Sequence, residues 1–146
     1  PVPAAKKKYI PLDTAREARR RGVAFGRLLD PVGAPVEMAY SLLPWAREQG
    51  LDYAYTQSWL AGVWSEGIDA GSHTGLRRIV KRAGLDWNDA KHVLRDKAWR
   101  VEAEVNRQEM MERGIWGVPS FRIGDTITWG QDRLWVMEHA LRKLSQ

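Results

Sequence analysis

The fold of this chain is decided by one stretch near its end, GIWGVPSFRIGDTITWGQDRL, residues 114–134. Gly114 follows a long run with helical periodicity, and glycine suits the left-handed position that ends many helices. Two β-rich runs come next, SFRI at 120–123 and TITW at 126–129, separated only by a Gly–Asp pair. Such a pair between two apolar runs predicts a β-hairpin.

A final helix is predicted directly after the hairpin. In LWVMEHAL, residues 134–141, the apolar residues Leu134, Met137 and Leu141 recur at helical spacing. Asp132 precedes this run and is placed to cap the helix through a side-chain oxygen. The stretch as a whole therefore predicts a helix end, two short strands and a helix start.

Upstream of residue 114 the sequence is predicted to be largely helical and contains no internal repeat. Apolar spacing, capping residues and Gly or Pro stop signals divide it into segments. The first eight residues predict an extended lead-in, and residues 26–33 predict a loop. The predicted helices are Tyr9–Arg21 with Pro11 in its first turn, one that starts at Pro35 and is kinked by Pro44, one capped by Asp52, one capped by Ser72 and ended by Gly84, one capped by Asp86, and Lys97–Arg113.

Length and composition limit the class of protein. A chain of 146 residues can form one domain with a core of its own. A hydrophobic content of 44% and eight Trp favour a globular fold over disorder. No apolar run approaches the roughly 18 residues that a membrane span requires, so we expect none. Because Cys is absent, this chain cannot exchange disulfides and needs no oxidising compartment.

Positive charge is concentrated near the N-terminal end. The formal net charge is +5, and residues 1–27 hold eight Lys and Arg against Asp13 and Glu17. A basic segment can contact nucleic acid, which leaves a non-catalytic binding module open as one function. No aromatic residues are interleaved with its arginines, however. We therefore favour a solvated helix face and expect no nucleic-acid partner.

Several motifs resemble the DsbA-like branch of the thioredoxin superfamily. GIWGVPSF (114–121) and WGQDRL (129–134) stand in that family's order and near its spacing. The likeness extends to 2-hydroxychromene-2-carboxylate isomerases and kappa-class glutathione transferases. Residues 6–25 and 59–71 are similar to the segments before and inside the helical insertion of this family.

The resemblance implies an α/β fold class, the C-terminal portion of a thioredoxin-like fold with an inserted all-helical domain. It assigns 1–30 to the end of the N-terminal half, 31–113 to the inserted helical domain, and 114–146 to the C-terminal half. The family's N-terminal strand–helix–strand, with its catalytic Ser or Cys, is absent from this sequence. A lone hairpin is marginally stable, so we expect another segment, of the same protein or of a second chain, to complete the sheet. A homodimer also stays open.

The resemblance also places a ligand site on the 114–134 stretch. In this family the bond before the proline of the GVP motif is cis, and we expect the same of Val118–Pro119. The backbone N–H and C=O of Val118 should then point outward, where the tripeptide glutathione can add like a short strand. Gln131 and Asp132, at the start of the last helix, are implied to hold the γ-glutamyl end. The expected cofactor is therefore glutathione.

Candidates for a substrate pocket are Trp116, Trp129, Trp64 and Tyr9, although packing is the commoner role of such residues. No catalytic residue is expected in this chain, because Ser120 has no neighbour that would activate it and no nucleophile–base pair stands out. The three His residues lack the spacing of metal ligands, so no metal site is expected.

By resemblance, the intact protein is a glutathione-dependent isomerase or transferase acting on an electrophilic, aromatic small molecule. Residues outside this chain would stabilise the glutathione thiolate, so the chain alone should be inactive. A thiol–disulfide oxidoreductase, with its CxxC motif outside the chain, stays open as an alternative. No signal peptide is visible in the sequence, and we expect a cytoplasmic protein.

Overall fold

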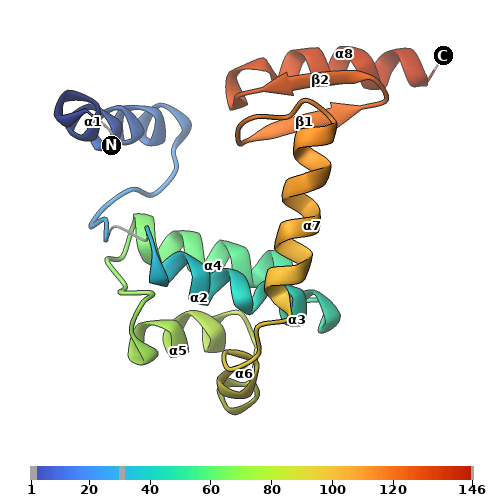
Figure 1. Ribbon diagram of the computed structural model, residues 1–146. Coiled ribbons are helices and arrows are strands. Elements are labelled where there is room, and N and C mark those ends of the chain that lie inside the picture. The colour runs from blue at the N-terminus through green and yellow to red at the C-terminus, as the bar shows by residue number, and fades with distance from the viewer. Residues whose placement is uncertain (1–2, 30–31, 146) are drawn as a thin grey trace. The chain divides into compact units, whose positions relative to one another are not determined.

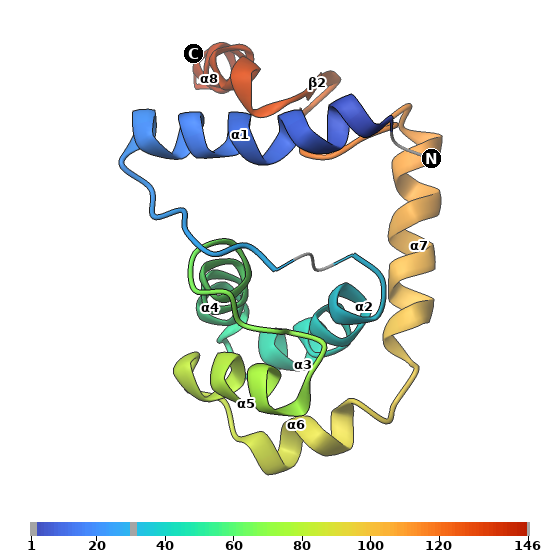
Figure 2. The same ribbon diagram turned by 90° about the vertical axis from the view of Figure 1, so that its left-hand side faces the viewer.

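Helices make up most of the structure and are followed by one hairpin and a last helix (Figures 1 and 2). The computed structural model describes residues 3–29 and 32–145. Internal contacts separate two units, Pro1–Trp99 and Arg100–Gln146. The elements are α1 (Ala4–Arg21), α2 (Ala34–Ser41), α3 (Leu43–Glu48), α4 (Asp52–Trp64), α5 (His73–Arg82), α6 (Trp87–Val93), α7 (Trp99–Glu112), β1 (Ser120–Ile123), β2 (Thr126–Trp129), the 3-10 helix η1 (Gln131–Arg133) and α8 (Leu134–Leu144).

The core of the first unit lies where α4 packs against α5, side by side in both ribbon views (Figures 1 and 2). Leu76, Ile79 and Val80 of α5 are fully buried, because helical spacing places all three on one face. A polar bridge also joins the two helices. Arg82 donates from Nε to the Ser58 hydroxyl at 2.9 Å and from its terminal nitrogen to the Ser58 carbonyl at 2.6 Å.

Where the sequence predicted a helix kinked at Pro44, the structure has two helices with a break just before this proline. Helix α2 ends at Ser41 and α3 begins at Leu43, with the fully buried Leu42 between them. Pro44 lies in the first turn of α3, where the missing N–H removes no intrahelical hydrogen bond. The proline thus starts a new helix.

Of the three caps predicted upstream of the hairpin, two are confirmed and one is wrong. The Ser72 hydroxyl accepts from the Gly75 N–H at 3.0 Å, and an Asp86 carboxylate oxygen accepts from the Asn88 and Asp89 N–H groups. Helix α4, however, is preceded by Leu51 in the capping position, with no side-chain cap. Asp52 is already the first helical residue, so it is one position too late to serve as the cap.

The prediction of an extended lead-in over residues 1–8 is wrong for residues 4–8, which are helical. Helix α1 begins at Ala4, and the Lys7 N–H donates to the Pro3 carbonyl. Alanine and lysine are strong helix formers, and this run outweighs the effect of Pro11, which stands inside the helix. Helix α1 ends, as predicted, at Arg21 before the left-handed Gly22. None of its described residues is buried.

The predicted hairpin is confirmed within the second unit. Strands β1 and β2 pair antiparallel, with Ser120 opposite Trp129 and Phe121 opposite Thr128. Helix α8 packs on both strands, and Thr128 and Met137 are buried. Since side chains alternate across a strand, Ile127 and Trp129 belong to the opposite face from Thr128, and they are 40% and 45% exposed.

The predicted limits of the N-terminal half, the inserted helical domain and the C-terminal half are not tested by these two units. The boundary predicted between residues 30 and 31 lies outside the described residues. The boundary predicted at 113/114 follows the end of α7, where Gly114 has a left-handed φ of 69°. Among the described helices, none combines the length and apolar character that crossing a membrane would require.

Candidate functional site

The loop that enters the hairpin has a defined geometry. The Val118–Pro119 peptide bond is cis, in agreement with the expectation from the sequence. The Ser120 hydroxyl donates back to the Gly117 carbonyl, which closes the turn. The Gly130 N–H donates to the Pro119 carbonyl at 3.0 Å and extends the hairpin pairing by one position.

Val118 presents free backbone polar groups at this loop. Its side chain is 76% exposed, and neither its N–H nor its C=O makes a hydrogen bond within residues 3–29 and 32–145. Val118 directly precedes Pro119, and Gln131 directly follows Gly130, the residue that is hydrogen-bonded to Pro119. The two halves of the predicted glutathione site therefore lie at the same end of the hairpin.

Two tryptophans flank the loop. The rings of Trp116 and Trp129 have centroids 4.6 Å apart and planes tilted by 38°. A Cβ atom added at Gly117 would lie 2.7 Å from the Trp129 Nε1, so only glycine allows this indole to pack on the backbone. The rings stay 69% and 45% exposed and form an open wall next to Val118.

The residues after the hairpin differ from the predicted cap. Gln131–Arg133 form the 3-10 helix η1, and α8 begins only at Leu134, with Arg133 in the capping position. Asp132 therefore does not cap α8, because the extra turn moves the helix start two residues past it. Its carboxylate instead pairs with the Arg133 terminal nitrogen at 3.2 Å.

The other two pocket candidates belong to the first unit. The Trp64 ring lies 6.4 Å from the Phe25 ring. The Tyr9 hydroxyl donates to Asp13 at 3.0 Å, and this hydrogen bond, with the carboxylate charge, raises the pKa of Tyr9. Trp64 and Tyr9 thus belong to the first unit, and the other site candidates belong to the second.

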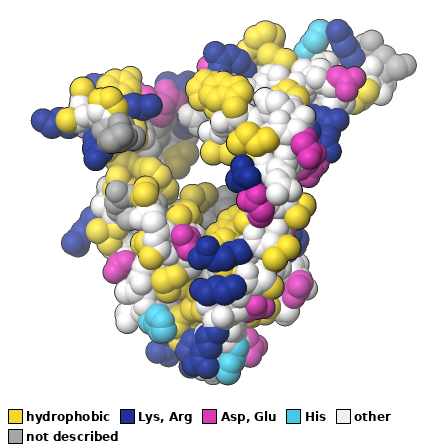
Figure 3. Space-filling model, viewed as in Figure 1, with side chains coloured by type: hydrophobic (Ala, Val, Ile, Leu, Met, Phe, Trp, Pro, Cys, Tyr) yellow, Lys and Arg dark blue, Asp and Glu magenta, His cyan; other side chains and the backbone are white. Residues whose placement is uncertain are grey.

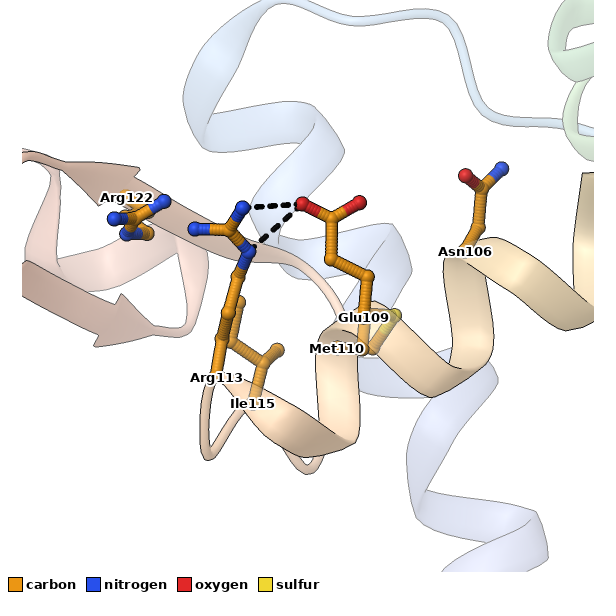
Figure 4. A pocket seen from close by; sticks show the side chains of 6 residues that line it. All are labelled: Asn106, Glu109, Met110, Arg113, Ile115 and Arg122. Carbon is orange, nitrogen blue, oxygen red and sulfur yellow. Dashed lines mark hydrogen bonds and ion pairs between the residues drawn. The ribbon is translucent and has the colours of Figure 1, made fainter.

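The second unit also contains a pocket that sequence reasoning missed (Figure 4). It has a volume of about 370 Å³ and is open to solvent. Arg113 and Glu109 form an ion pair on its α7 side, and Arg122 comes from β1 (Figure 4). The missed signal is the helical spacing of Asn106, Glu109 and Met110 on α7, which Arg113, directly after the helix, continues. The lining residues are Asn106, Glu109, Met110, Arg113, Ile115 and Arg122.

The groups at the hairpin end are suited to binding a ligand. They are free backbone donors and acceptors, a carboxylate, a guanidinium and exposed indoles. The Ser120 hydroxyl is engaged by the Gly117 carbonyl and has no base beside it in the described chain. No group of three or more His, Cys, Asp or Glu side chains in the described ranges is arranged to hold a metal ion.

Comparisons with known proteins connect this geometry to a family. The sequence pattern of the DSBA-like thioredoxin domain matches residues 4–142. The 2-hydroxychromene-2-carboxylate isomerase of Pseudomonas putida is 30% identical over 91 residues, which are 62% of this chain and 45% of that protein. The protein of the same name from Sphingobium xenophagum is 31% identical over 97 residues, 66% of this chain and 50% of that protein.

The fold agrees with the sequence match. A solved structure of a 2-hydroxychromene-2-carboxylate isomerase superimposes with a TM-score of 0.72, at 22% identity, over 97% of this chain and 68% of that chain. The chain spans about half the length of the curated relatives that it matches. The DsbA-like α/β fold is thus present here in a helix-rich form with a small two-stranded sheet.

Proposed function

Since the chain belongs to the family of DSBA-like thioredoxin domains, we propose that it is part of a glutathione-dependent isomerase or transferase of the DsbA/kappa type. The observation that supports the proposal is the free backbone N–H and C=O of Val118, which lies next to the Pro119–Gly130 hydrogen bond and so at the same end of the hairpin as Gln131. Two relatives at or above 30% identity are both named 2-hydroxychromene-2-carboxylate isomerase, and the benzene ring of a chromene supports an aromatic substrate for this protein.

In this proposal glutathione binds in two parts. Its central cysteine lies extended along Val118 and Pro119 and exchanges backbone hydrogen bonds with Val118, as an added strand does. Its γ-glutamyl end lies at Gln131 and Asp132, where a carboxylate can accept from the ligand ammonium. A tripeptide held at both ends keeps its thiol in a defined direction, which is what a thiol-dependent reaction requires.

The substrate would lie against the aromatic wall. The rings of Trp116 and Trp129 contact each other at a tilt and are exposed, so an aromatic electrophile can cover them and remove apolar area from water. Burial of the aromatic substrate next to the thiol would favour attack by excluding water.

We propose that a segment outside this sequence supplies the rest of the catalytic centre. The hairpin is the only sheet in the described residues, and Ile127 and Trp129 are exposed on its outer face. A further strand would pair with an open edge of the hairpin and stabilise this small sheet. That segment, from the same protein or a second chain, would provide the residue that stabilises the thiolate, in a cytoplasmic enzyme that is a candidate homodimer.

A titration with glutathione tests the proposal. Ligand that binds only the folded state raises the unfolding free energy by about 2.7 kcal/mol at 100 times Kd, so the melting temperature of the 146-residue chain should rise. Cysteinylglycine, which lacks the γ-glutamyl end, should raise it less. Asp132→Asn should reduce the shift, and Asp125→Asn in the hairpin turn is the matched control. A melting temperature that glutathione leaves unchanged would overturn the proposal.

The oxidoreductase alternative uses the same exposed backbone. In that case Val118 would present the strand of a disulfide-bonded protein substrate, and the γ-glutamyl contact would not be needed. Equal stabilisation by glutathione and cysteinylglycine would favour this alternative. Turnover of an aromatic substrate by the 146-residue chain alone would contradict the assignment of the thiolate-stabilising residue to another segment.

A further inference from the structure

The exposed face of α5 carries a concentration of positive charge. Arg77, Arg78 and Lys81 lie on one side of the helix, because residues three and four positions apart share a face. All three residues are exposed, whereas the apolar side chains of α5 lie on its buried opposite face. Figure 3 shows Lys and Arg side chains, in dark blue, gathered at the lower end of the view, where Figure 1 draws α5 and α6. We propose that these three residues, the α5 basic face, bind an acidic segment of a partner protein.

The charge of the α5 basic face is not neutralised within the protein. Helix α5 contains no Asp or Glu, and Arg77, Arg78 and Lys81 make no ion pair with any side chain that the structure describes. The next basic residue differs, because Arg82 bridges to Ser58 of α4. Like charges three or four residues apart destabilise a helix. An anionic partner that covers this face would therefore relieve the repulsion as well as form ion pairs.

Several exposed arginines on other helices are paired with an acid of the same helix. The partners lie three or four residues apart, the spacing that brings side chains together on a helix surface. These pairs are Arg20–Glu17 at 2.8 Å on α1, Arg107–Glu104 at 2.7 Å on α7 and Arg142–Glu138 at 2.6 Å on α8. The α5 basic face differs from these helices, and its donors stay available to a partner.

The surroundings of the α5 basic face favour a protein partner. A lipid surface is held by exposed apolar side chains next to the charges, but Leu76, Ile79 and Val80 of α5 are fully buried. Single-stranded nucleic acid is held by exposed aromatic rings on which bases stack, but Trp87, at the start of α6, is only 8% exposed. Carboxylates need neither feature, and they match the planar donors of arginine in two-bond geometry.

An oligo-glutamate peptide is the probe for this surface. The 146-residue chain should bind the labelled peptide at low ionic strength, and added salt should weaken binding because exposed ion pairs are screened. The triple variant Arg77→Gln, Arg78→Gln and Lys81→Gln should bind about tenfold more weakly, since three exposed pairs of roughly twofold each multiply to about that factor. Arg77→Lys with Arg78→Lys, which keeps the charge, should retain part of the binding. Fluorescence anisotropy measures all of these affinities.

The matched control removes the same charge from α1. Lys6→Gln, Lys7→Gln and Lys8→Gln lower the net charge equally, but consecutive residues point around a helix and form no common face. This variant should bind within about twofold of the wild type, with circular dichroism confirming that both triple variants are folded. Equal losses in the two variants, or no binding by the wild type, would overturn the proposal. Tighter binding of duplex DNA or of phosphatidylserine vesicles through the α5 basic face would also overturn it, because the face would then select phosphate ligands.

Discussion

Gly75 lies in the first turn of α5, directly against the backbone that precedes the helix. A Cβ atom added there would overlap the Asp69 carbonyl oxygen, a backbone atom that cannot rotate away. The residue must therefore be glycine, although alanine is the better helix former in general by about 1 kcal/mol.

Gly75→Ala should destabilise the protein by about 1–3 kcal/mol, the usual range for added volume in a packed site. Urea unfolding measures the change. Gly114→Ala is the control for backbone strain alone, since Gly114 has a φ of 69° and nothing within 4 Å of the added atom. Equal losses in the two variants would show that overlap with Asp69 is not the cause.

The buried Tyr55 should make the stability of the first unit decrease at alkaline pH. Its side chain is 2% exposed and its hydroxyl donates to the Ala39 carbonyl at 2.9 Å. Burial raises the pKa of Tyr55, because the charged phenolate would lose its hydration. Because the pKa of Tyr55 in the folded state is higher than its ordinary value of about 10, the folded state is favoured while the hydroxyl stays protonated. This contribution to stability is complete below pH 10 and is lost as the pH rises toward the folded-state pKa.

Tyr55→Phe should lower the unfolding free energy by about 1 kcal/mol at neutral pH, through the lost hydrogen bond. Its stability should then fall less than that of the wild type as the pH is raised above 10. Urea unfolding at pH 7, 9 and 11 measures both effects, with Tyr53→Phe on the exposed side of α4 as control. Parallel pH profiles for wild type and Tyr55→Phe would contradict this account.

At the scale of elements, the start of a helix depends on where its first turn closes. Ser72 caps α5 by accepting from the Gly75 N–H, whereas Asp52 stands one residue inside α4 and caps nothing. Both residues have the same chemical ability to cap, so only the structure separates them.

Ser72→Ala should therefore cost about 1 kcal/mol of stability, as the loss of an N-cap does. Asp52→Ala should cost only a few tenths, about the interaction of an exposed charge with a helix dipole. Melting temperatures of the two variants, with circular dichroism to confirm helix content, measure the difference. A larger loss of stability for Asp52→Ala than for Ser72→Ala would mean that Asp52 does cap α4.

Strands and helices differ in how well their limits were predicted. Both strands have the predicted bounds, because the Gly–Asp turn and the alternation of side chains define a register locally. Helix starts were less predictable: α1 begins at Ala4 instead of Tyr9, and α8 at Leu134, after an extra 3-10 turn. Several nearby residues can begin a helix with similar free energy, and packing selects among them.

At the scale of the molecule, the two units differ in how much they bury. The first contains a cluster of fully buried Leu, Ile and Val side chains, while Met137 and Thr128 are the buried residues among those described in the second. A small sheet with one packed face has little apolar burial to oppose local opening.

Amide hydrogen exchange should therefore be slower in α4 and α5 than in β1, β2 and α8. The expected gap is at least tenfold in protection, since each tenfold step corresponds to about 1.4 kcal/mol of opening free energy. Mass spectrometry of exchanged peptides measures it. Equal protection of the hairpin and of α5 would show that the second unit gains stability from contacts beyond its own core.

The sequence by itself determined the hairpin, its register, the ends of several helices and the identity of the residues at the Val118–Gln131 end. These features depend on chain neighbours, turn chemistry and side-chain periodicity, which are local properties. Only the tertiary structure decided that Asp132 does not cap α8, that Trp129 packs on Gly117, and that Trp64 and Tyr9 belong to another unit. Those outcomes depend on atoms that meet across the fold, and no local pattern in the sequence specifies which of them come into contact.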